Sequence, residues 1–305
     1  MRLGVDLGGT KIEVVALGGD GGIALRRRCP TPAADGYDAI VRAVAGLVAA
    51  AESDLGISGA TVGVGTPGAV VPSTGRLRNA NTTCLNGRPL PQDLQAALGR
   101  PVRLANDANC LALSESADGA AAGSAVAFAA ILGTGVGGGL VVGGSLVGGC
   151  NGVAGEWGHN PLPWPRDDER PGPPCYCGRA GCIETFLSGP AFARAHASCH
   201  GDTLDPVSIA QSAAAGDPAA SDSMRRYAGR LARALASVIN LVDPDVIVLG
   251  GGVSNVSALY ALVPRLWDAW VFADAAVCTQ LVRAAHGDSS GVLGAARLWD
   301  QADPA

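Results

Sequence analysis

The sequence predicts an α/β protein made of two related domains. Short apolar runs typical of strands alternate along the chain with stretches of helical periodicity. DLGGTKIEVVAL at 6–17 and ILGTGVGGGLVV at 131–142 also share one plan, in which a strand, a Gly/Thr turn and a second strand follow one another. Such self-similarity indicates a duplicated unit. We therefore expect a smaller N-terminal domain over 1–115 plus 288–305 and a larger domain over 116–287.

The periodicity of apolar residues and the turn residues between them predict the elements in chain order. Strands are expected at 2–7, 12–17, 23–29, 61–65, 102–105, 125–132, 139–142 and 246–249. Helices are expected at 37–54, 89–98, 109–117 and 292–299, with three helical stretches after Cys182, the last at 221–241. Residues 149–182 are rich in Gly and Pro and predict a long loop.

Composition excludes several classes of function. The 305 residues are 48% hydrophobic and 16% charged, which suffices for a sizeable core. A net charge of -5 and an aromatic content of 4% argue against nucleic-acid binding. The most apolar stretch, 119–150, is broken by glycines and predicts no membrane span, and the N-terminus lacks a secretory signal. Nine cysteines, an odd number, predict no disulfide framework, so we expect a cytoplasmic protein.

Glycine-rich turns are candidate phosphate-binding sites. The first comprises Gly8, Gly9, Thr10 and Lys11, the second contains Thr134 and Gly135, and a strand end carries Gly250, Gly251 and Gly252. Glycine lets a ligand approach the backbone, and the threonine hydroxyl adds a donor. An ordinary glycine hairpin is the alternative for any one turn, but the combination favours phosphate binding. The only lysine, Lys11, is either a solvated surface residue or a charge beside a phosphate.

Two common nucleotide-binding motifs are excluded. GTGVGG at 133–138 matches G-x-G-x-x-G, but a strand pattern follows it where a dinucleotide fold requires a helix. A P-loop requires Ser or Thr after its lysine, whereas Ile12 follows Lys11.

Polar residues at a strand end and in loops are candidate substrate ligands. Asn106 and Asp107 lie where an expected strand gives way to a helix, which is where α/β folds bind ligands. Asp107 is either a helix cap or a base that accepts a hydroxyl proton during phosphoryl transfer. Together with Asn81, Glu156 and Glu184, Asp107 forms a set able to hold the hydroxyls of a sugar, although any single one is more often a polar loop residue.

Three cysteines form a candidate zinc site. Cys175, Cys177 and Cys182 follow the pattern C-x-C-x4-C, and His159 is the simplest fourth ligand of a Cys3His set. His196 and His200 are rivals for that position, at helical spacing. A Cys175–Cys182 disulfide and a redox pair are the alternatives to zinc.

At this point the chain resembles the ROK-family sugar kinases from Leu3 to Trp299. The resemblance rests on VDLGGTK (5–11), GVGTPG (63–68), LANDANC (104–110), ILGTGVGGG (131–139), GEWGH (155–159), CYCGRAGCIE (175–184) and DPDVIVLGGG (243–252). It implies the actin-like, hexokinase-type (ribonuclease H-like) fold, with two α/β domains around a cleft. It also implies ATP and Mg²⁺ as cofactors, a structural Zn²⁺, a hexose substrate and a homodimer.

Carried over by position, the resemblance assigns a role to each candidate residue. Asp107 becomes the catalytic base, and Asp6 lies near the magnesium. The sugar contacts are Asn81, Asn106, Asp107, Glu156, His159 and Glu184. The nucleotide contacts are Gly8, Gly9, Thr10, Lys11, Thr134, Gly135, Gly250, Gly251 and Gly252. The zinc ligands are His159, Cys175, Cys177 and Cys182.

Within the family, NANTTCLNG (79–87) with AGEWGHNPLPW (154–164) is most similar to bacterial fructokinases of the mannofructokinase type. The resemblance therefore implies phosphorylation of fructose, and of mannose as a further substrate, at the 6-hydroxyl. A kinase for N-acetylglucosamine or glucose is the alternative, because those enzymes share NDANC, GTGVGGG and CGxxGCIE. A sugar sensor on the same fold is the non-enzyme alternative, but a sensor would not need Asp107 as a base.

Overall fold

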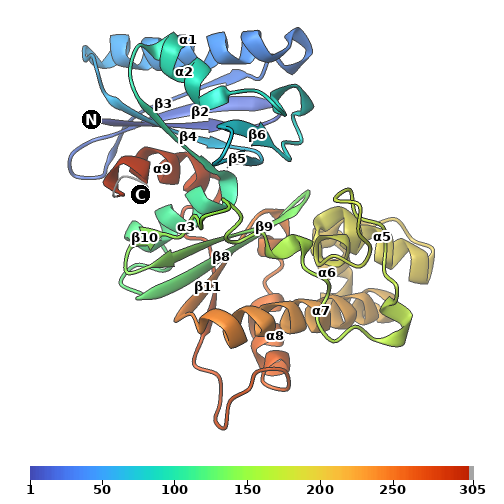
Figure 1. Ribbon diagram of the computed structural model, residues 1–305. Coiled ribbons are helices and arrows are strands. Elements are labelled where there is room, and N and C mark those ends of the chain that lie inside the picture. The colour runs from blue at the N-terminus through green and yellow to red at the C-terminus, as the bar shows by residue number, and fades with distance from the viewer. Residues whose placement is uncertain (302–305) are drawn as a thin grey trace. The chain divides into compact units, whose positions relative to one another are not determined.

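The computed structural model describes residues 1–301 and confirms the α/β class (Figure 1). Its chain forms two compact units. The first comprises Met1–Gly119, Gly139–Ala154 and the C-terminal segment from Asp288, and the second comprises Ala120–Gly138 and Gly155–Gly287. The predicted boundaries differ in residues 116–119 and 139–154, which the sequence placed in the second domain. Within the first unit a Cβ atom at Gly139 would lie 2.5 Å from the Ala108 carbonyl oxygen, so this segment packs directly on a helix of that unit.

Two five-stranded sheets have the same strand order. The first runs β3 (Ile23–Pro30), β2 (Lys11–Leu17), β1 (Arg2–Leu7), β4 (Thr61–Thr66) and β7 (Val102–Asn106). The second runs β10 (Ser145–Leu146), β9 (Val136–Val142), β8 (Val126–Leu132), β11 (Val246–Gly250) and β12 (Gln280–Arg283). In each, the last three strands are parallel. The duplication predicted from the two Gly/Thr turns is therefore confirmed.

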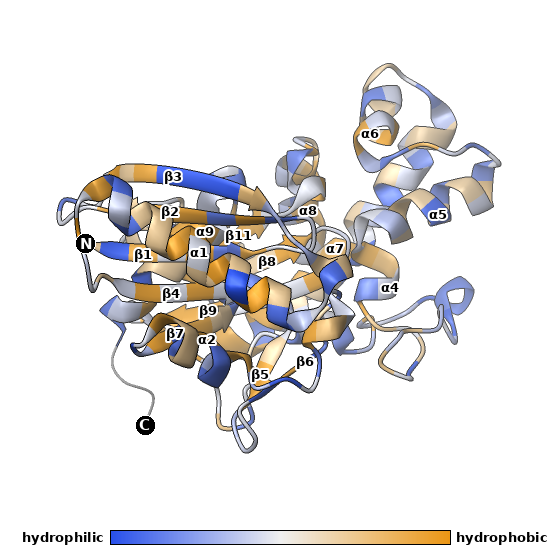
Figure 2. Cartoon of the chain, turned by 90° about the horizontal axis from the view of Figure 1, so that it is seen from above, coloured by the Kyte–Doolittle hydropathy of each residue, from blue (hydrophilic) through white to orange (hydrophobic). Residues whose placement is uncertain are grey.

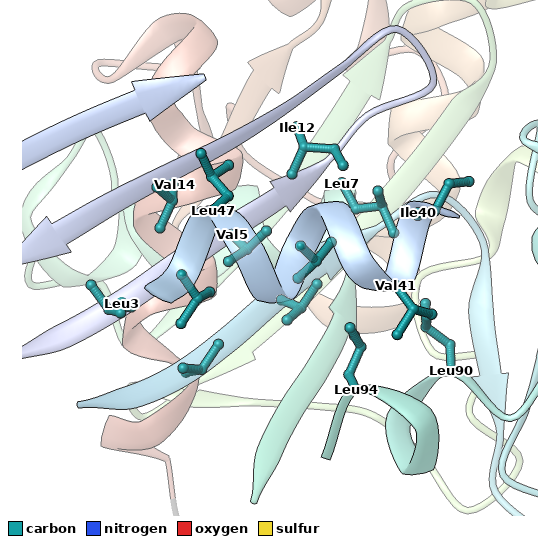
Figure 3. Packing of buried hydrophobic residues seen from close by; sticks show 14 of the residues in the cluster. Leu3, Val5, Leu7, Ile12, Val14, Ile40, Val41, Leu47, Leu90 and Leu94 are labelled. Carbon is teal, nitrogen blue, oxygen red and sulfur yellow. The ribbon is translucent and has the colours of Figure 1, made fainter. Parts of the chain in front are cut away.

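Helices on both faces bury the first sheet. Ile40, Val41 and Leu47 of α1 (Tyr37–Leu55) point toward the apolar side chains of β1, beside α2 (Leu90–Leu98) (Figure 3). On the opposite face α9 (Ser290–Arg297) packs between the sheet and α3 (Asp107–Asp118). A Cβ atom at Gly63 would lie 1.8 Å from the Ala295 carbonyl oxygen, and the sequence needs glycine there because backbone meets backbone.

The helices of the second unit are α4 (Glu184–Leu187), α5 (Gly189–His200), α6 (Pro206–Ala214), α7 (Pro218–Val242) and α8 (Leu259–Trp267). The starts of α5, α6 and α7 carry clear sequence signals. Ser188, Asp205 and Asp217 cap α5, α6 and α7 with their side chains, and a proline follows each within two residues. This combination is typical of helix starts because the cap accepts a backbone N–H that proline does not need. Of the helices in the described part of the chain, none is long and apolar enough to cross a membrane.

Two elements that carry candidate site residues begin earlier in the chain than predicted. β9 begins at Val136, within the segment predicted as a turn, and α3 begins at Asp107 rather than at residue 109. The hairpin of β5 (Ala69–Val71) and β6 (Arg76–Arg78) was not predicted, because strands of three residues show no alternation. The middle of the edge strand β3 is hydrophilic (Figure 2) because it consists of Arg26, Arg27 and Arg28, each of which forms an ion pair.

Candidate functional site

In the first unit, the turn from Gly8 to Thr10 joins β1 to β2. It is closed by a hydrogen bond from the Gly8 N–H to the Lys11 carbonyl oxygen (3.0 Å), and Thr31 Oγ1 donates to the Gly8 carbonyl oxygen (2.7 Å). A Cβ atom at Gly9 would lie 3.3 Å from Thr82 Oγ1, so the loop carrying Asn81 lies against this turn. The turn is thus a fixed backbone loop whose exposed Gly9 and Thr10 are available to a ligand.

Lys11 begins β2 directly after this turn. Its side chain is 47% exposed, and its Nζ lies 3.7 Å from the buried Glu13 carboxylate. Arg26 and Arg28 also contact Glu13, so the lysine shares its counterion with two other cations. Both interpretations of Lys11, surface residue and phosphate ligand, stay predictions.

Two acidic residues lie at the carboxyl ends of parallel strands in the first sheet. Asp6 is at the end of β1, and Asp107 follows the end of β7; both strands run parallel to β4 between them. Burial and then repulsion by Asp107 and Glu13 raise the pKa of Asp6 to about 6, although Lys11 opposes the shift. A divalent cation bound next to two such carboxylates would relieve the repulsion between them.

The cap of α3 is Asn106, not Asp107. Asn106 Oδ1 accepts the Asn109 N–H (2.8 Å), whereas Asp107 is the first helical residue and is exposed. Asp107 Oδ1 accepts the backbone N–H of its neighbour Ala108 (2.8 Å). Asn106 therefore has the capping role that the sequence suggested as an alternative for Asp107. The Asp107 carboxylate lies at the first position of the helix.

The loop that carries Asn81 has its shape set by its neighbours. The Asn86 side chain makes two hydrogen bonds with the backbone of Ala80, at 2.8 and 2.9 Å. Gly68 has φ +77°, and a Cβ atom there would lie 2.2 Å from the Arg78 carbonyl oxygen. The exposed side chain of Asn81 is therefore displayed from a rigid loop.

In the second unit, the turn from Gly133 to Gly135 joins β8 to β9. The Gly133 N–H donates to the Gly135 carbonyl oxygen (3.0 Å), and the Gly189 N–H at the start of α5 donates to the Gly133 carbonyl oxygen (2.8 Å). Gly251 lies against the same turn with φ +80°, since a Cβ atom there would lie 2.6 Å from the Leu132 carbonyl oxygen. The turn that contains Thr134 and Gly135 and the triple glycine at 250–252, both predicted to bind phosphate, therefore lie next to one another.

Glu184 also belongs to this turn. Its Oε2 accepts the Val136 N–H (2.9 Å), and a Cβ atom at Gly135 would lie 2.7 Å from the same oxygen. Thr134 and Glu184 line a cavity of about 190 Å³ together with Tyr176 and Arg194, two residues that the sequence did not single out. Neither forms a recognisable motif: Tyr176 lies between Cys175 and Cys177, and Arg194 is on α5.

Trp157 is a further residue that sequence reasoning missed. It lies between Glu156 and His159 in a short 3-10 turn and is 5% exposed. Its Nε1 donates to the Gly137 carbonyl oxygen (2.7 Å), and its ring packs edge-on against Phe128 at 5.7 Å. Trp157 therefore fixes the loop that carries both predicted ligands to β9.

The four predicted zinc ligands lie together. The Nδ1 atom of His159 and the Sγ atoms of Cys175, Cys177 and Cys182 are all within 4.8 Å of one another. Two of the separations, Cys175 Sγ to His159 Nδ1 and Cys177 Sγ to Cys182 Sγ, are 3.6 Å. Ligands of a tetrahedral zinc ion lie about 3.7 Å apart, given zinc–sulfur bonds of about 2.3 Å. All nine cysteines are free thiols, so the alternative disulfide is not formed.

His159 has partners at both ring nitrogens. Nε2 lies 2.9 Å from the Tyr176 hydroxyl, and the two rings meet edge-on at 5.0 Å. A hydroxyl at Nε2 leaves Nδ1 facing the thiols, which is the orientation a metal ligand needs. The sugar contact predicted for His159 would require Tyr176 to give up this position.

The fold and these turns are those of the sugar-kinase class of α/β proteins. The sequence pattern of the ROK family matches residues 2–302, and the chain belongs to the ROK family. It is 39% identical over 302 residues to an N-acetyl-D-glucosamine kinase of Photobacterium profundum, covering 98% of this chain and 99% of that protein.

Two solved structures share the fold over nearly the whole chain. A ROK hexokinase from Thermus thermophilus has a TM-score of 0.85 at 34% identity, covering 97% of this chain and 96% of that one. A ROK family glucokinase from Streptomyces griseus, solved with glucose and AMPPNP, has a TM-score of 0.77 at 31% identity, covering 97% and 98%. The predicted family and hexokinase-type fold are confirmed. The finer resemblance to fructokinases is not supported, because the curated relatives carry the name N-acetyl-D-glucosamine kinase.

Proposed function

We propose that this protein is an ATP-dependent N-acetyl-D-glucosamine kinase that phosphorylates the sugar 6-hydroxyl. The observation that carries the proposal is similarity over the full length: curated N-acetyl-D-glucosamine kinases are 36–39% identical across 98% of the chain. The motifs NDANC, GTGVGGG and CGxxGCIE are consistent with it. This replaces the fructose specificity expected from the loops at 79–87 and 154–164, since loop resemblance is a weaker guide than similarity over 302 residues.

Asp107 is the proposed general base. Its exposed carboxylate, at the first position of α3 and not used as the cap, can accept a hydroxyl proton as that oxygen attacks phosphorus. Asn81, Asn106, Glu156 and Glu184 are the proposed sugar contacts. Because phosphoryl transfer needs little covalent help from the protein, these residues act by positioning the acceptor.

The glycine turns are the proposed nucleotide site. ATP with Mg²⁺ supplies the transferred phosphoryl group and neutralises its charge. The residues fit such a ligand: Gly251, with φ +80°, packs its backbone against Leu132 and Gly133 so that the triple glycine lies beside the second turn, and Thr134 of that turn lines a cavity. Asp6 is proposed to lie near the magnesium, since its raised pKa reflects burial and repulsion that a cation would relieve.

Zinc at the cysteine cluster is proposed to be structural. Three thiolates and one imidazole complete a tetrahedral set and leave no open position for a reacting group. The ion would hold residues 159–182 as one loop, which brings Glu184, two residues after Cys182, to the turn at Gly135.

A panel of sugars tests the substrate assignment. ADP release with ATP and Mg²⁺ should give the highest kcat/KM for N-acetyl-D-glucosamine, with glucose, mannose and fructose lower. A preference for fructose would restore the fructokinase assignment within the family. Sugar binding without ADP release from any member of the panel would favour a sensor.

A further inference from the structure

Arg194 on α5 is a positively charged residue to which neither the sequence nor the proposed function assigns a role. Its side chain is exposed, and within residues 1–301 it forms no ion pair and no hydrogen bond. Arg226, Arg230 and Arg233 of α7, which packs against α5, each bond to a carboxylate instead. The charge of Arg194 is therefore available to a ligand.

The position of Arg194 directs this charge toward the second glycine turn. Arg194 lines the cavity of about 190 Å³ together with Thr134 of that turn and Pro190 of α5. The helix begins against the turn, because the Gly189 N–H donates to the Gly133 carbonyl oxygen at 2.8 Å. Arg194 follows about 7.5 Å further along the helix axis, and side chains on a helix lean toward its N-terminus. A guanidinium on its long stem therefore returns to the cavity beside the turn.

The hydroxyl groups of the cavity leave Arg194 as its main source of donors. Thr185 Oγ1 donates to the Cys182 carbonyl oxygen at 2.7 Å, and Ser188 Oγ caps α5. In the described part of the chain the side chains of Thr134 and Arg194 have no such partner. A guanidinium has five N–H donors and no acceptor, so these two residues favour a ligand rich in acceptor atoms.

The charges that line the cavity also give Arg194 a specific task. Glu184 is the only carboxylate in the lining, and it would repel an anion bound beside the turn. Arg194 is the only cation in the same lining, so it offsets this repulsion. The single lysine of the chain, Lys11, belongs to the first unit and lies beside the first glycine turn. Arg194 thus supplies the second turn with a cation from its own unit.

We propose that Arg194 is a specificity-determining residue that binds a phosphate group of the nucleotide at the second glycine turn. This inference rests on the proposed nucleotide site at that turn. A guanidinium forms paired hydrogen bonds with two phosphate oxygens and stays charged at any working pH. Arg194 thereby distinguishes a nucleoside phosphate from the bare nucleoside, which has no anionic oxygens to bind.

Calorimetric titration of the intact protein with ATP and with adenosine, both with Mg²⁺ and without sugar, tests the assignment. Arg194→Met keeps the apolar stem but removes the charge, and it should weaken ATP binding about tenfold or more, the effect of losing a hydrogen bond between charged groups. Adenosine affinity should not change. Arg194→Lys keeps the charge without the paired bonds and should fall between the two. The matched control is Arg265→Met, an exposed arginine of the second unit that does not line the cavity.

Binding is measured here without turnover, so this test is separate from that of the kinase reaction. ATP affinity of Arg194→Met equal to that of wild type would overturn the proposal, as would an equal loss of ATP and adenosine affinity. Wild-type protein that binds no ATP would refute both the nucleotide site and the role of Arg194. ATP binding that depends on Arg194, in a protein that phosphorylates no sugar, would contradict only the proposed kinase activity.

Discussion

The Glu184 carboxylate accepts a hydrogen bond from the Val136 backbone N–H at 2.9 Å. This contact joins Glu184, two residues after Cys182, to the turn that carries Thr134 and Gly135. The same Glu184 oxygen, Oε2, would lie 2.7 Å from a Cβ atom at Gly135, so any side chain there would displace the carboxylate. Glu184, predicted only as a sugar ligand, is therefore also a structural part of the second glycine turn.

We expect Glu184→Ala to weaken nucleotide binding as well as sugar binding. Removing the acceptor leaves a buried N–H unpaired at Val136, which costs about 1–3 kcal/mol of unfolding free energy. Glu184→Gln is the matched control, because its amide oxygen can still accept the bond. Urea unfolding and ATP titration of both variants measure the difference; equal losses in the two would assign the effect to charge alone.

Asp107→Asn and Asn106→Ala should separate catalysis from helix capping. The first keeps the shape but cannot take a proton, so kcat should fall by roughly 10²–10⁴-fold with stability unchanged. The second removes the cap of α3 and should lower the free energy of unfolding by about 0.5–2 kcal/mol. Turnover and thermal unfolding on both variants check this. Near-normal turnover in Asp107→Asn would mean that the base lies elsewhere.

Cys177→Ser should lose zinc from the cysteine cluster. Without the ion the loop from 159 to 182 is no longer closed, so sugar affinity should collapse, while nucleotide binding should fall less. Elemental analysis with sugar and ATP titrations on the same sample measures this, and the control is Cys150→Ser, an exposed cysteine outside the cluster. Wild-type protein that contains no zinc and stays active after chelation would contradict a structural metal.

Tyr176→Phe probes the partner of the histidine ligand. The change removes the hydroxyl 2.9 Å from His159 Nε2 but keeps the ring contact. We expect zinc affinity to fall by about 10–100-fold, the usual effect of losing such a support. Competition with a chelator measures the affinity. An unchanged affinity, with altered sugar binding, would instead mean that Tyr176 only occupies the place of a sugar hydroxyl.

A buried ion-pair cluster holds the long loop to α7. Glu169 Oε1 accepts hydrogen bonds from Arg230 and Arg233, both at 2.8 Å, and Arg233 also donates to the Trp164 carbonyl oxygen. Glu169→Gln leaves two buried cations without their counterion and should cost about 3–5 kcal/mol of unfolding free energy. Asp167→Asn, an exposed neighbour in the same loop, should cost little.

The Glu169 cluster also predicts a pH dependence. Burial opposes ionisation, but hydrogen bonds from Arg230, the Arg166 backbone and Arg233 lower the pKa of Glu169 below its ordinary value. The unfolded chain then binds more protons than the folded one, so this stabilisation is fully present above the ordinary carboxyl pKa and is lost as pH falls below it through the lowered pKa of the folded state. Urea unfolding at several pH values should show a shallower acid loss in Glu169→Gln than in wild type.

The sequence by itself determined the features that depend on local pattern. Apolar periodicity located the main strands and helices, the repeated Gly/Thr turn predicted two related domains, and the spacing of Cys175, Cys177 and Cys182 with His159 predicted the metal cluster. Each of these features depends on residue types and their spacing along the sequence, and can be recognised without knowing how distant segments pack.

Only the tertiary structure decided what each polar side chain does. Asn106 rather than Asp107 caps α3, because the strand β7 runs one residue further than its apolar pattern. Glu184 bonds to Val136, 48 residues away, and Trp157 to Gly137, 20 residues away, contacts that no local spacing encodes. A side chain's partners depend on which segments pack beside it, and that is settled by burying apolar surface over the whole unit rather than by the neighbouring sequence.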